Sequence, residues 1–294
     1  MHPADWTAAS VFVDIFHQVP PAQDADAFVH ALLDICRERQ VNYVLPLTDI
    51  EVDVLSPLRD TFSSVGAMLC LSSHNAVRVC RDKLRIHEVF KDDDLITTIP
   101  TWNMDNLSST ASVFPMIAKP RSGRSSEGVI RINDRTELSH YTTRLSGAGY
   151  ILQPLLDGSI HVTDIVRQQA SGCHAAMSRK ELLRTVNGAG LTIEMLHDGT
   201  QNKQAQHIAE RLDLNGCVNI EFLMHKGRLH LMDINPRFSA GVAFTKLAGY
   251  DMTANHLRCF SDEAIEHCAP PRSAIYTRRY VEMAITPSIS QPRQ

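Results

Sequence analysis

The first part of the chain alternates short apolar runs with segments of helical periodicity. Residues 24–40 repeat apolar side chains on one helical face, and Asp24 stands where an N-cap is expected. Apolar runs at 41–47 and 65–71 predict buried strands, and apolar residues spaced four apart over 50–62 predict a helix between them. Alternation of strands and helices is typical of a parallel sheet, so we expect an α/β arrangement here.

The remainder of the chain is richer in strands. The pattern predicts one helical stretch over 74–90 and later helices at 200–212, 242–247 and 252–260. Strands are expected at 98–102, 113–119, 129–132, 150–156, 161–169, 173–180, 191–196 and 275–285. This mixture predicts an α+β arrangement after the α/β part.

The stretch Val218–Arg237 is the clearest strand pair, because apolar and polar side chains alternate on both sides of a short turn. A three-residue loop at this turn would pair His225 with Leu229. The same register places Glu221 opposite Asp233. The two carboxylates are therefore expected to share one face of the hairpin.

Asp233 and Asn235 stand two residues apart, so their side chains leave the same face of their strand. Together with Glu221 they would gather two carboxylates and an amide oxygen, which suits Mg²⁺ held between protein and phosphates. Arg237 follows at the strand end as a fixed cation. The spacing alone favours a surface hairpin whose acids are only solvated, because a strand with two outward acids is ordinary.

A strand ending in Lys119 leads into a loop rich in glycine and serine, after which a strand resumes at residue 129. No Gly-Lys-Ser leads into a helix, so this is not a Walker loop. Small residues let backbone N–H groups approach an anion, and hydroxyls such as those of Ser125 and Ser126 add donors. The segment therefore fits a phosphate-binding loop, and it fits a flexible hairpin tip as well.

Composition narrows the classes of function. The chain has 294 residues, 44% of them hydrophobic and 21% charged, with a net charge of −4, and its basic residues are scattered, so nothing indicates nucleic-acid or membrane binding. No apolar run reaches membrane-spanning length, and the first ten residues are too polar for a signal peptide. The seven cysteines form no Cys-x-x-Cys pair, which favours reduced thiols in the cytoplasm over zinc.

Several motifs together resemble those of one superfamily. Asp233-Ile-Asn-Pro-Arg237, preceded by Asn219-Ile-Glu221, resembles the metal-binding strand pair of ATP-grasp ligases, in particular the relatives of the carbamoyl-phosphate synthetase large subunit. Other motifs follow in the order of that family: Asp82-Lys83, Lys119 with its Gly/Ser loop, the strand 150–156, Arg184, and then the metal strands. Individually these motifs are weak, and their fixed order is much more specific.

The resemblance implies an ATP-grasp fold of two α+β lobes preceded by a truncated Rossmann-like pre-ATP-grasp domain. We expect the truncated domain over 1–80 and the ATP-grasp domain over 81–294, with a lid lobe at about 113–155. The relatives begin with a Gly-rich strand–turn–helix unit that this chain does not show before Val11. We therefore expect a shortened N-terminal domain.

The resemblance also implies residue roles. The expected metal ligands for Mg²⁺ or Mn²⁺ are Glu221, Asp233 and Asn235. The expected ATP-binding residues are Lys83, Lys119, Ser125, Ser126, the adenine hinge Gln153, Pro154, Leu155 and Leu156, and the metal-binding pair Glu221 and Asp233. The expected catalytic residues are Lys119, Arg184 and Arg237. Lys119 would orient the terminal phosphoryl group with Lys83, and the two arginines would neutralise charge on the transferred group and the acyl-phosphate.

The implied activity is that of an ATP-dependent, ADP-forming ligase that activates a small-molecule carboxylate as an acyl-phosphate for attack by an amine. A homodimer is an option that the resemblance leaves open. The second hypothesis is a nucleotide-binding or partner protein with weak or lost turnover. Two departures favour it: Ile160 replaces the acid that holds the ribose in the relatives, and the Gly-rich N-terminal unit of the relatives is missing. Pro154, where the relatives usually have glutamate, is a further departure. Retention of the metal ligands and both arginines favours the enzyme.

Overall fold

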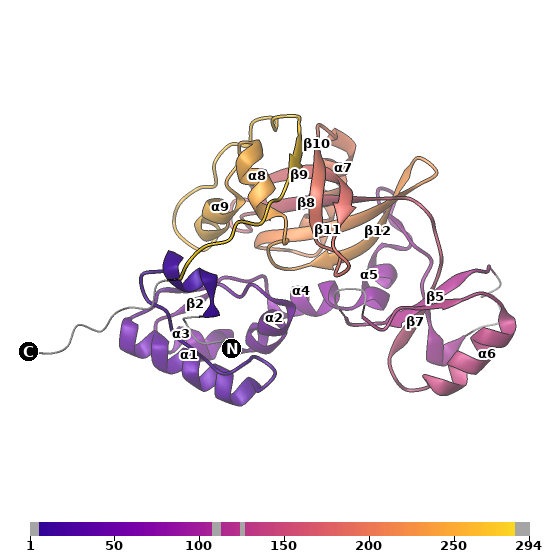
Figure 1. Ribbon diagram of the computed structural model, residues 1–294, viewed down its shortest axis with the longest axis horizontal. Coiled ribbons are helices and arrows are strands. Elements are labelled where there is room, and N and C mark those ends of the chain that lie inside the picture. Colours follow the sequence, from indigo (N-terminus) through magenta and orange to yellow (C-terminus); the bar gives the residue numbers. More distant parts are fainter. Residues whose placement is uncertain (1–5, 108–112, 124–126, 286–294) are drawn as a thin grey trace, which may run out of the picture. The chain divides into compact units, whose positions relative to one another are not determined.

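The computed structural model describes residues 6–107, 113–123 and 127–285 (Figure 1). The chain forms two compact units. One comprises the described residues of Met1–Val44, Leu58–Leu69 and Arg278–Gln294, and the other comprises those of Leu45–Pro57 and Cys70–Thr277. The domain boundary expected between residues 80 and 81 stays a prediction. Among the described residues, no helix has the length and apolar character that a membrane span requires.

The smaller unit contains a two-stranded parallel sheet of β1 (Tyr43–Val44) and β2 (Met68–Leu69). Its helices are η2 (Ala8–Phe12), α1 (Ala25–Arg39) and α3 (Arg59–Ser63). Asp24 caps α1 as expected, since its Oδ1 accepts from the Ala27 N–H at 3.4 Å. The strands are shorter than the apolar runs 41–47 and 65–71, because only the paired residues of each run enter the ladder.

The larger unit is built on a seven-stranded sheet with the order β13-β10-β9-β8-β11-β12-β3. All neighbours are antiparallel except the β12–β3 pair. The strands are β3 (Thr97–Thr98), β8 (Ser159–Arg167), β9 (His174–Arg184), β10 (Gly190–Leu196), β11 (Gly216–His225), β12 (Arg228–Asn235) and β13 (Ile275–Thr277). The associated helices are α2 (Asp49–Leu55), η3 (Ser56–Leu58), α4 (His74–Cys80), α5 (Lys83–Phe90), α7 (Gly199–Arg211), α8 (Val242–Ala248) and α9 (Met252–Arg258).

Both faces of this sheet are covered by helices. Apolar residues of α4, α5 and α7 pack against Val218, Ile220 and Phe222 of β11. Apolar residues of α8 and α9 pack with Cys217 of the same strand. Since side chains alternate along a strand, Asn219 and Glu221 share the face of Cys217. The polar positions of β11 therefore continue the face that α8 and α9 cover.

A second, four-stranded antiparallel sheet has the order β4-β7-β5-β6. Its strands are β4 (Trp102–Asn103), β5 (Met116–Pro120), β6 (Ile130–Ile132) and β7 (Tyr150–Pro154), accompanied by η4 (Met104–Asn106) and α6 (Arg135–Arg144). Met116, Ile132 and Leu152 form its core with Leu138 and Tyr141 of α6. Three of its strands fall within 113–155 and β4 lies before that range. The lid lobe expected at about 113–155 stays a prediction.

Some predicted elements differ from the observed ones. The stretch 74–90 is two helices rather than one, because the carboxylate of Asp82 accepts from the N–H groups of Leu84 and Arg85 and so begins α5 anew. The helix predicted from Thr200 is capped by Asp198 instead. The last strand ends at Thr277, well before residue 285, because only 275–277 pair with β10.

Candidate active site

The β11–β12 hairpin closes through a two-residue turn. Lys226 and Gly227 both have positive φ angles, 47° and 75°, and His225 pairs with Arg228. Such angles are those of a type I′ turn, whose twist matches that of the flanking strands. The expected three-residue loop that closes His225 on Leu229 is therefore wrong.

A β-bulge then shifts the register between Glu221 and Phe222. Phe222 pairs with Leu231 and Glu221 pairs with Asp233, so Met232 is the extra residue on β12. Without the register shift, Met232 would pair with Glu221 and Asp233 with Ile220, so the Asp233 side chain would leave the other face. The predicted Glu221–Asp233 pairing is confirmed, and it is the bulge rather than the loop that produces it.

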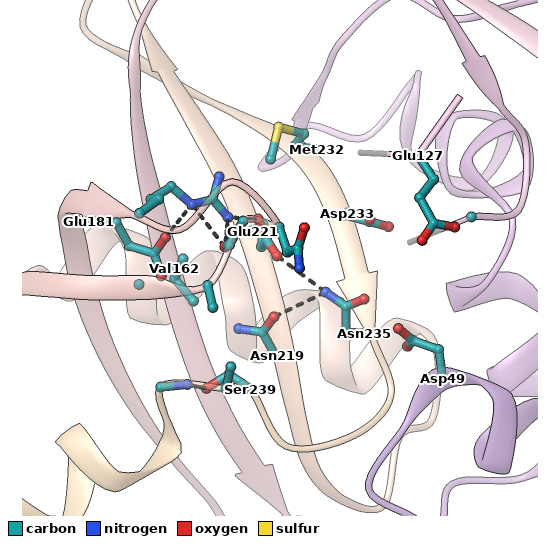
Figure 2. Close-up of a pocket in the computed structure, with 18 of the residues that line it drawn as sticks. Asp49, Glu127, Val162, Glu181, Asn219, Glu221, Met232, Asp233, Asn235 and Ser239 are labelled. Atoms are coloured by element: carbon teal, nitrogen blue, oxygen red, sulfur yellow. Dashed lines mark hydrogen bonds and ion pairs between the residues drawn. The ribbon is translucent and has the colours of Figure 1, made fainter. Parts of the chain in front are cut away.

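The bulged hairpin lines a cavity of about 490 Å³ in the larger unit (Figure 2). Seven of the predicted site residues line it: Lys83, Lys119, Arg184, Glu221, Asp233, Asn235 and Arg237. Lys83 comes from the first turn of α5 and Lys119 from β5 of the smaller sheet. Residues from far apart in the sequence thus meet in one place. The predicted ligands Ser125 and Ser126 lie outside the described residues.

Two of the three predicted metal ligands, Glu221 and Asn235, are joined by a hydrogen bond, and Asp233 lines the same cavity. The Asn235 amide donates to Asn219 Oδ1 at 3.0 Å and to Glu221 Oε1 at 3.4 Å, as Figure 2 shows. The Oδ1 of Asn235 takes no part in these two bonds, so it can serve as an acceptor or ligand. Burial raises the pKa of Glu221. No group of three or more His, Cys, Asp or Glu side chains suited to a metal occurs among the described residues, so a site here depends on the amide of Asn235.

Both acids are already paired with cations. Arg184 Nη2 donates to Glu221 Oε2 at 3.0 Å, and Lys83 Nζ lies 3.4 Å from Asp233 Oδ2. Arg184 also pairs with Glu181 at 2.6 Å and donates to the Gly188 carbonyl oxygen. This donor set of carboxylates and an amide fits Mg²⁺ or Mn²⁺, which would compete with the two side-chain cations for the same oxygens.

Lys119 differs from the other cations of the cavity. It is 9% exposed, and within the described ranges no carboxylate lies within 4.0 Å of its ammonium group. Burial lowers its pKa to about 8, the charge of Lys83 acts in the same direction, and Asp233 and Glu221 act against both. Lys119 is thus a buried cation whose partner is not among the described side chains, as expected for a group that binds phosphate.

Arg237 is held by an acid that the sequence interpretation did not single out. Its guanidinium donates through Nε and Nη2 to the two carboxylate oxygens of Asp49, at 2.8 Å each. Asp49 opens α2, where Thr48 and Glu51 form a capping box, and Arg81 lies 3.2 Å from its Oδ1. The 188 residues between Asp49 and Arg237 explain why no local pattern could reveal this pair.

A second buried pair lies beneath the cavity. Arg179 Nη1 donates to Asp164 at 2.6 Å, and their side chains are 1% and 0% exposed. Ser239 and Asn219 also donate to Asp164. The sequence interpretation did not single out Arg179. Local sequence gave no clear signal for it, because Arg179 stands beside Lys180 and Glu181 in β9.

The predicted adenine hinge does not line this cavity. The Leu155 N–H donates to the Pro115 carbonyl oxygen at 2.9 Å, and Pro154 has no N–H. Gln153 Nε2 donates to Thr101 Oγ1 at 2.8 Å, and its Oε1 is buried without a partner among the described residues. The hinge role of Gln153, Pro154, Leu155 and Leu156 therefore stays a prediction.

Comparison with known proteins agrees with this architecture. Residues 148–283 match a family model described as "ATP-grasp in the biosynthetic pathway with Ter operon". Residues 4–70 match one described as "PylC-like, N-terminal domain". The chain has the ATP-grasp fold with an N-terminal domain, and the two matches support a relationship to the ATP-grasp superfamily.

Solved structures show the same fold. Biotin carboxylase from Campylobacter jejuni has a TM-score of 0.72 at 13% identity, over 92% of this chain and 67% of that one. N5-carboxyaminoimidazole synthetase from Staphylococcus aureus, complexed with ADP, has a TM-score of 0.67 at 14% identity, over 88% of this chain and 67% of that one. L-amino acid ligase from Bacillus licheniformis has a TM-score of 0.64 at 14% identity, over 82% of this chain and 61% of that one. The chain spans only 24% of a similar pyruvate carboxylase from Rhizobium etli.

Proposed function

We propose that the protein is an ATP-dependent, ADP-forming ligase that joins a carboxylate to an amine. The observation that carries this proposal is the bulged hairpin, which brings Glu221 and Asp233 to one face. The same cavity holds Lys83, Lys119 and Arg184, so acidic oxygens and phosphate-binding cations line one space. Similar folds in an L-amino acid ligase and in an ADP complex of a synthetase support this reading.

Glu221, Asp233 and Asn235 would hold Mg²⁺ or Mn²⁺. When bound, the ion would neutralise negative charge on the nucleotide phosphates. The remaining work falls to side chains of the chain itself. Lys83 and Lys119 would orient the terminal phosphoryl group, Lys83 by moving from Asp233 toward the phosphates.

The reaction would proceed by two displacements. An oxygen of the substrate carboxylate attacks the terminal phosphorus, and ADP leaves, which gives an acyl-phosphate. The amine then attacks the acyl carbon, inorganic phosphate leaves, and an amide forms. Arg184 lies where it can stabilise charge on the transferred group. Arg237 can do so only after its two donors leave Asp49; otherwise it holds the strand end in position.

The seven cysteines are free, which supports the cytoplasmic location in this proposal. The partners would be small-molecule carboxylates and amines rather than nucleic acid or membrane. A homodimer stays open.

The decisive test is ADP release from ATP over a pool of amino acids with Mg²⁺. Hydroxylamine serves as a trap for the acyl-phosphate. Asp233→Asn should abolish turnover and leave the melting temperature nearly unchanged, because this ligand is partly exposed and supports little of the core. Asp94→Asn, at an exposed acid outside the cavity, is the matched control. If wild-type and Asp233→Asn proteins release ADP at equal rates, the metal site is wrongly placed.

The second candidate is an ATP-grasp protein that binds nucleotide without turnover. Two observations favour it. The Leu155 N–H already donates to the Pro115 carbonyl oxygen, so it is not free for adenine, and Ile160 offers no acceptor for ribose hydroxyls. The same assay separates the two, because this protein would bind MgADP in calorimetry and yet release no ADP with any substrate pool.

A further inference from the structure

A row of basic side chains on α4 and α5 is not used by the proposed catalytic site. His74, Arg78, Arg81 and Arg85 follow one another at intervals of four, three and four residues. His74 and Arg78 lie on α4, Arg81 follows as its C-cap, and Arg85 lies on α5.

The four residues line a groove of about 250 Å³ in the larger unit, on the α4–α5 segment of Figure 1. Two hydroxyl groups also line it, from Ser56 and from Ser122 at the root of the glycine- and serine-rich loop. Ser56 Oγ and His74 Nδ1 share a hydrogen bond of 2.9 Å, which orients the imidazole. The groove therefore presents guanidinium, imidazole and hydroxyl donors together.

The acids of the groove do not balance its arginines. Asp53 is taken by Arg81, whose Nε and Nη2 donate to its two oxygens at 2.9 and 3.0 Å. Asp82 is shared by Arg85 at 3.3 Å and Arg121 at 2.7 Å, while it also caps α5. The groove is left with an excess of positive charge.

Arg78 supplies this excess. It is exposed, and no carboxylate lies within 4.0 Å of its guanidinium among the residues that the structure describes. A guanidinium beside hydroxyls suits an oxyanion, because its planar donors match two oxygens of a phosphate.

We propose that this groove binds a small phosphorylated anion at a site separate from the catalytic cavity. Its volume suits a phosphate group with a small substituent rather than a polymer. The net charge of −4 and the scattered basic residues exclude an extended basic surface for nucleic acid. Arg81 belongs both to the groove and to the Arg81–Asp49–Arg237 series that reaches the catalytic cavity. An anion bound here thus competes with Asp49 for Arg81.

The test uses inorganic phosphate as the probe, measured by calorimetric titration of the full chain at constant ionic strength. Phosphate could also enter the catalytic cavity, so two variants are crossed. Arg78→Gln should weaken the groove site about tenfold or more, the usual effect of losing a charged hydrogen bond. Arg184→Gln should leave the groove site unchanged, and Arg144→Gln, at an exposed arginine of α6 outside the groove, is the matched control.

The outcomes separate this site from the catalytic one. Weaker phosphate binding in Arg78→Gln alone supports the groove. Loss in Arg184→Gln with full retention in Arg78→Gln assigns phosphate to the catalytic cavity and overturns the proposal, as does a wild-type protein that binds no phosphate at millimolar concentration. None of these results depends on turnover, so failure of the proposed ligase activity leaves this test intact.

Discussion

Replacing Lys119 by methionine should make the protein more stable and less able to bind nucleotide. The lysine is 9% exposed and its pKa is lowered to about 8, mainly by burial. Its charge therefore costs stability in the folded state. Methionine has a similar length and no charge, so it can occupy the same space without that cost.

The magnitude follows from the pKa shift. The pKa falls from 10.5 to about 8 on folding, and each unit corresponds to about 1.36 kcal/mol, which gives a cost of about 3 kcal/mol. Below pH 8 both folded and unfolded chains carry the proton, so the full cost applies. Between about pH 8 and 10.5 the unfolded chain binds more protons, so the free energy of unfolding rises with pH. Above this window the cost disappears.

The assay is urea denaturation of wild-type and Lys119→Met proteins across this pH range. The variant should be more stable by up to about 3 kcal/mol at pH 7, and the difference should vanish near pH 10.5. Lys203→Met, at an exposed lysine of α7, is the control and should show no such dependence. MgADP titration should show that Lys119→Met binds nucleotide more weakly.

The reasoning is refuted if Lys119→Met is less stable than the wild type at pH 7, or if the difference does not change with pH. Either result would mean that the ammonium group is well solvated or paired in the folded protein. A stable variant with unchanged MgADP affinity would instead remove Lys119 from the nucleotide site.

Three further predictions concern other parts of the larger unit. Asp164→Asn should lower the free energy of unfolding by about 3–5 kcal/mol in urea, because it removes the carboxylate that lies closest to the buried Arg179 charge and leaves only Glu181, at 3.9 Å; a loss below 1 kcal/mol would contradict this. Lys226→Asn should raise the melting temperature slightly, since asparagine tolerates the positive φ of the two-residue turn better; a clear decrease would count against the type I′ geometry. Because Ile160 offers no acceptor to the ribose, calorimetry should show similar affinities for ATP and 2′-deoxy-ATP, and strong rejection of the deoxy form would show that another acid holds the ribose.

Local sequence determined much of the secondary structure. Apolar periodicity predicted α1, α4, α7, α8 and α9, and capping chemistry placed the start of α1 at Asp24. These features depend on neighbours within one or two helical turns, so they can be read from the chain directly. The predicted helix boundaries were wrong where a second N-cap divides the stretch, as Asp82 does between α4 and α5.

The order of motifs also indicated the ATP-grasp fold and seven of the residues that line the cavity. Glu221, Asp233 and Asn235 lie on one face as the alternation predicted. The sequence could not show how, because neither the two-residue turn nor the bulge at Met232 has a signature in the hydrophobic pattern. The loop is one residue shorter than expected, and the bulge adds one residue to β12. The two differences cancel, so the predicted pairing of Glu221 with Asp233 is kept.

Only the tertiary structure decided which charges pair. Arg237 binds Asp49, and Arg179 binds Asp164. Each acid lies on a different helix or strand from its arginine, so the two partners are distant in the sequence. Such partners are chosen by sheet order and helix packing, which bring distant residues together in a poorly solvated space where charges must be matched. The pKa of Lys119 has the same origin, since its value depends on burial that no stretch of sequence specifies.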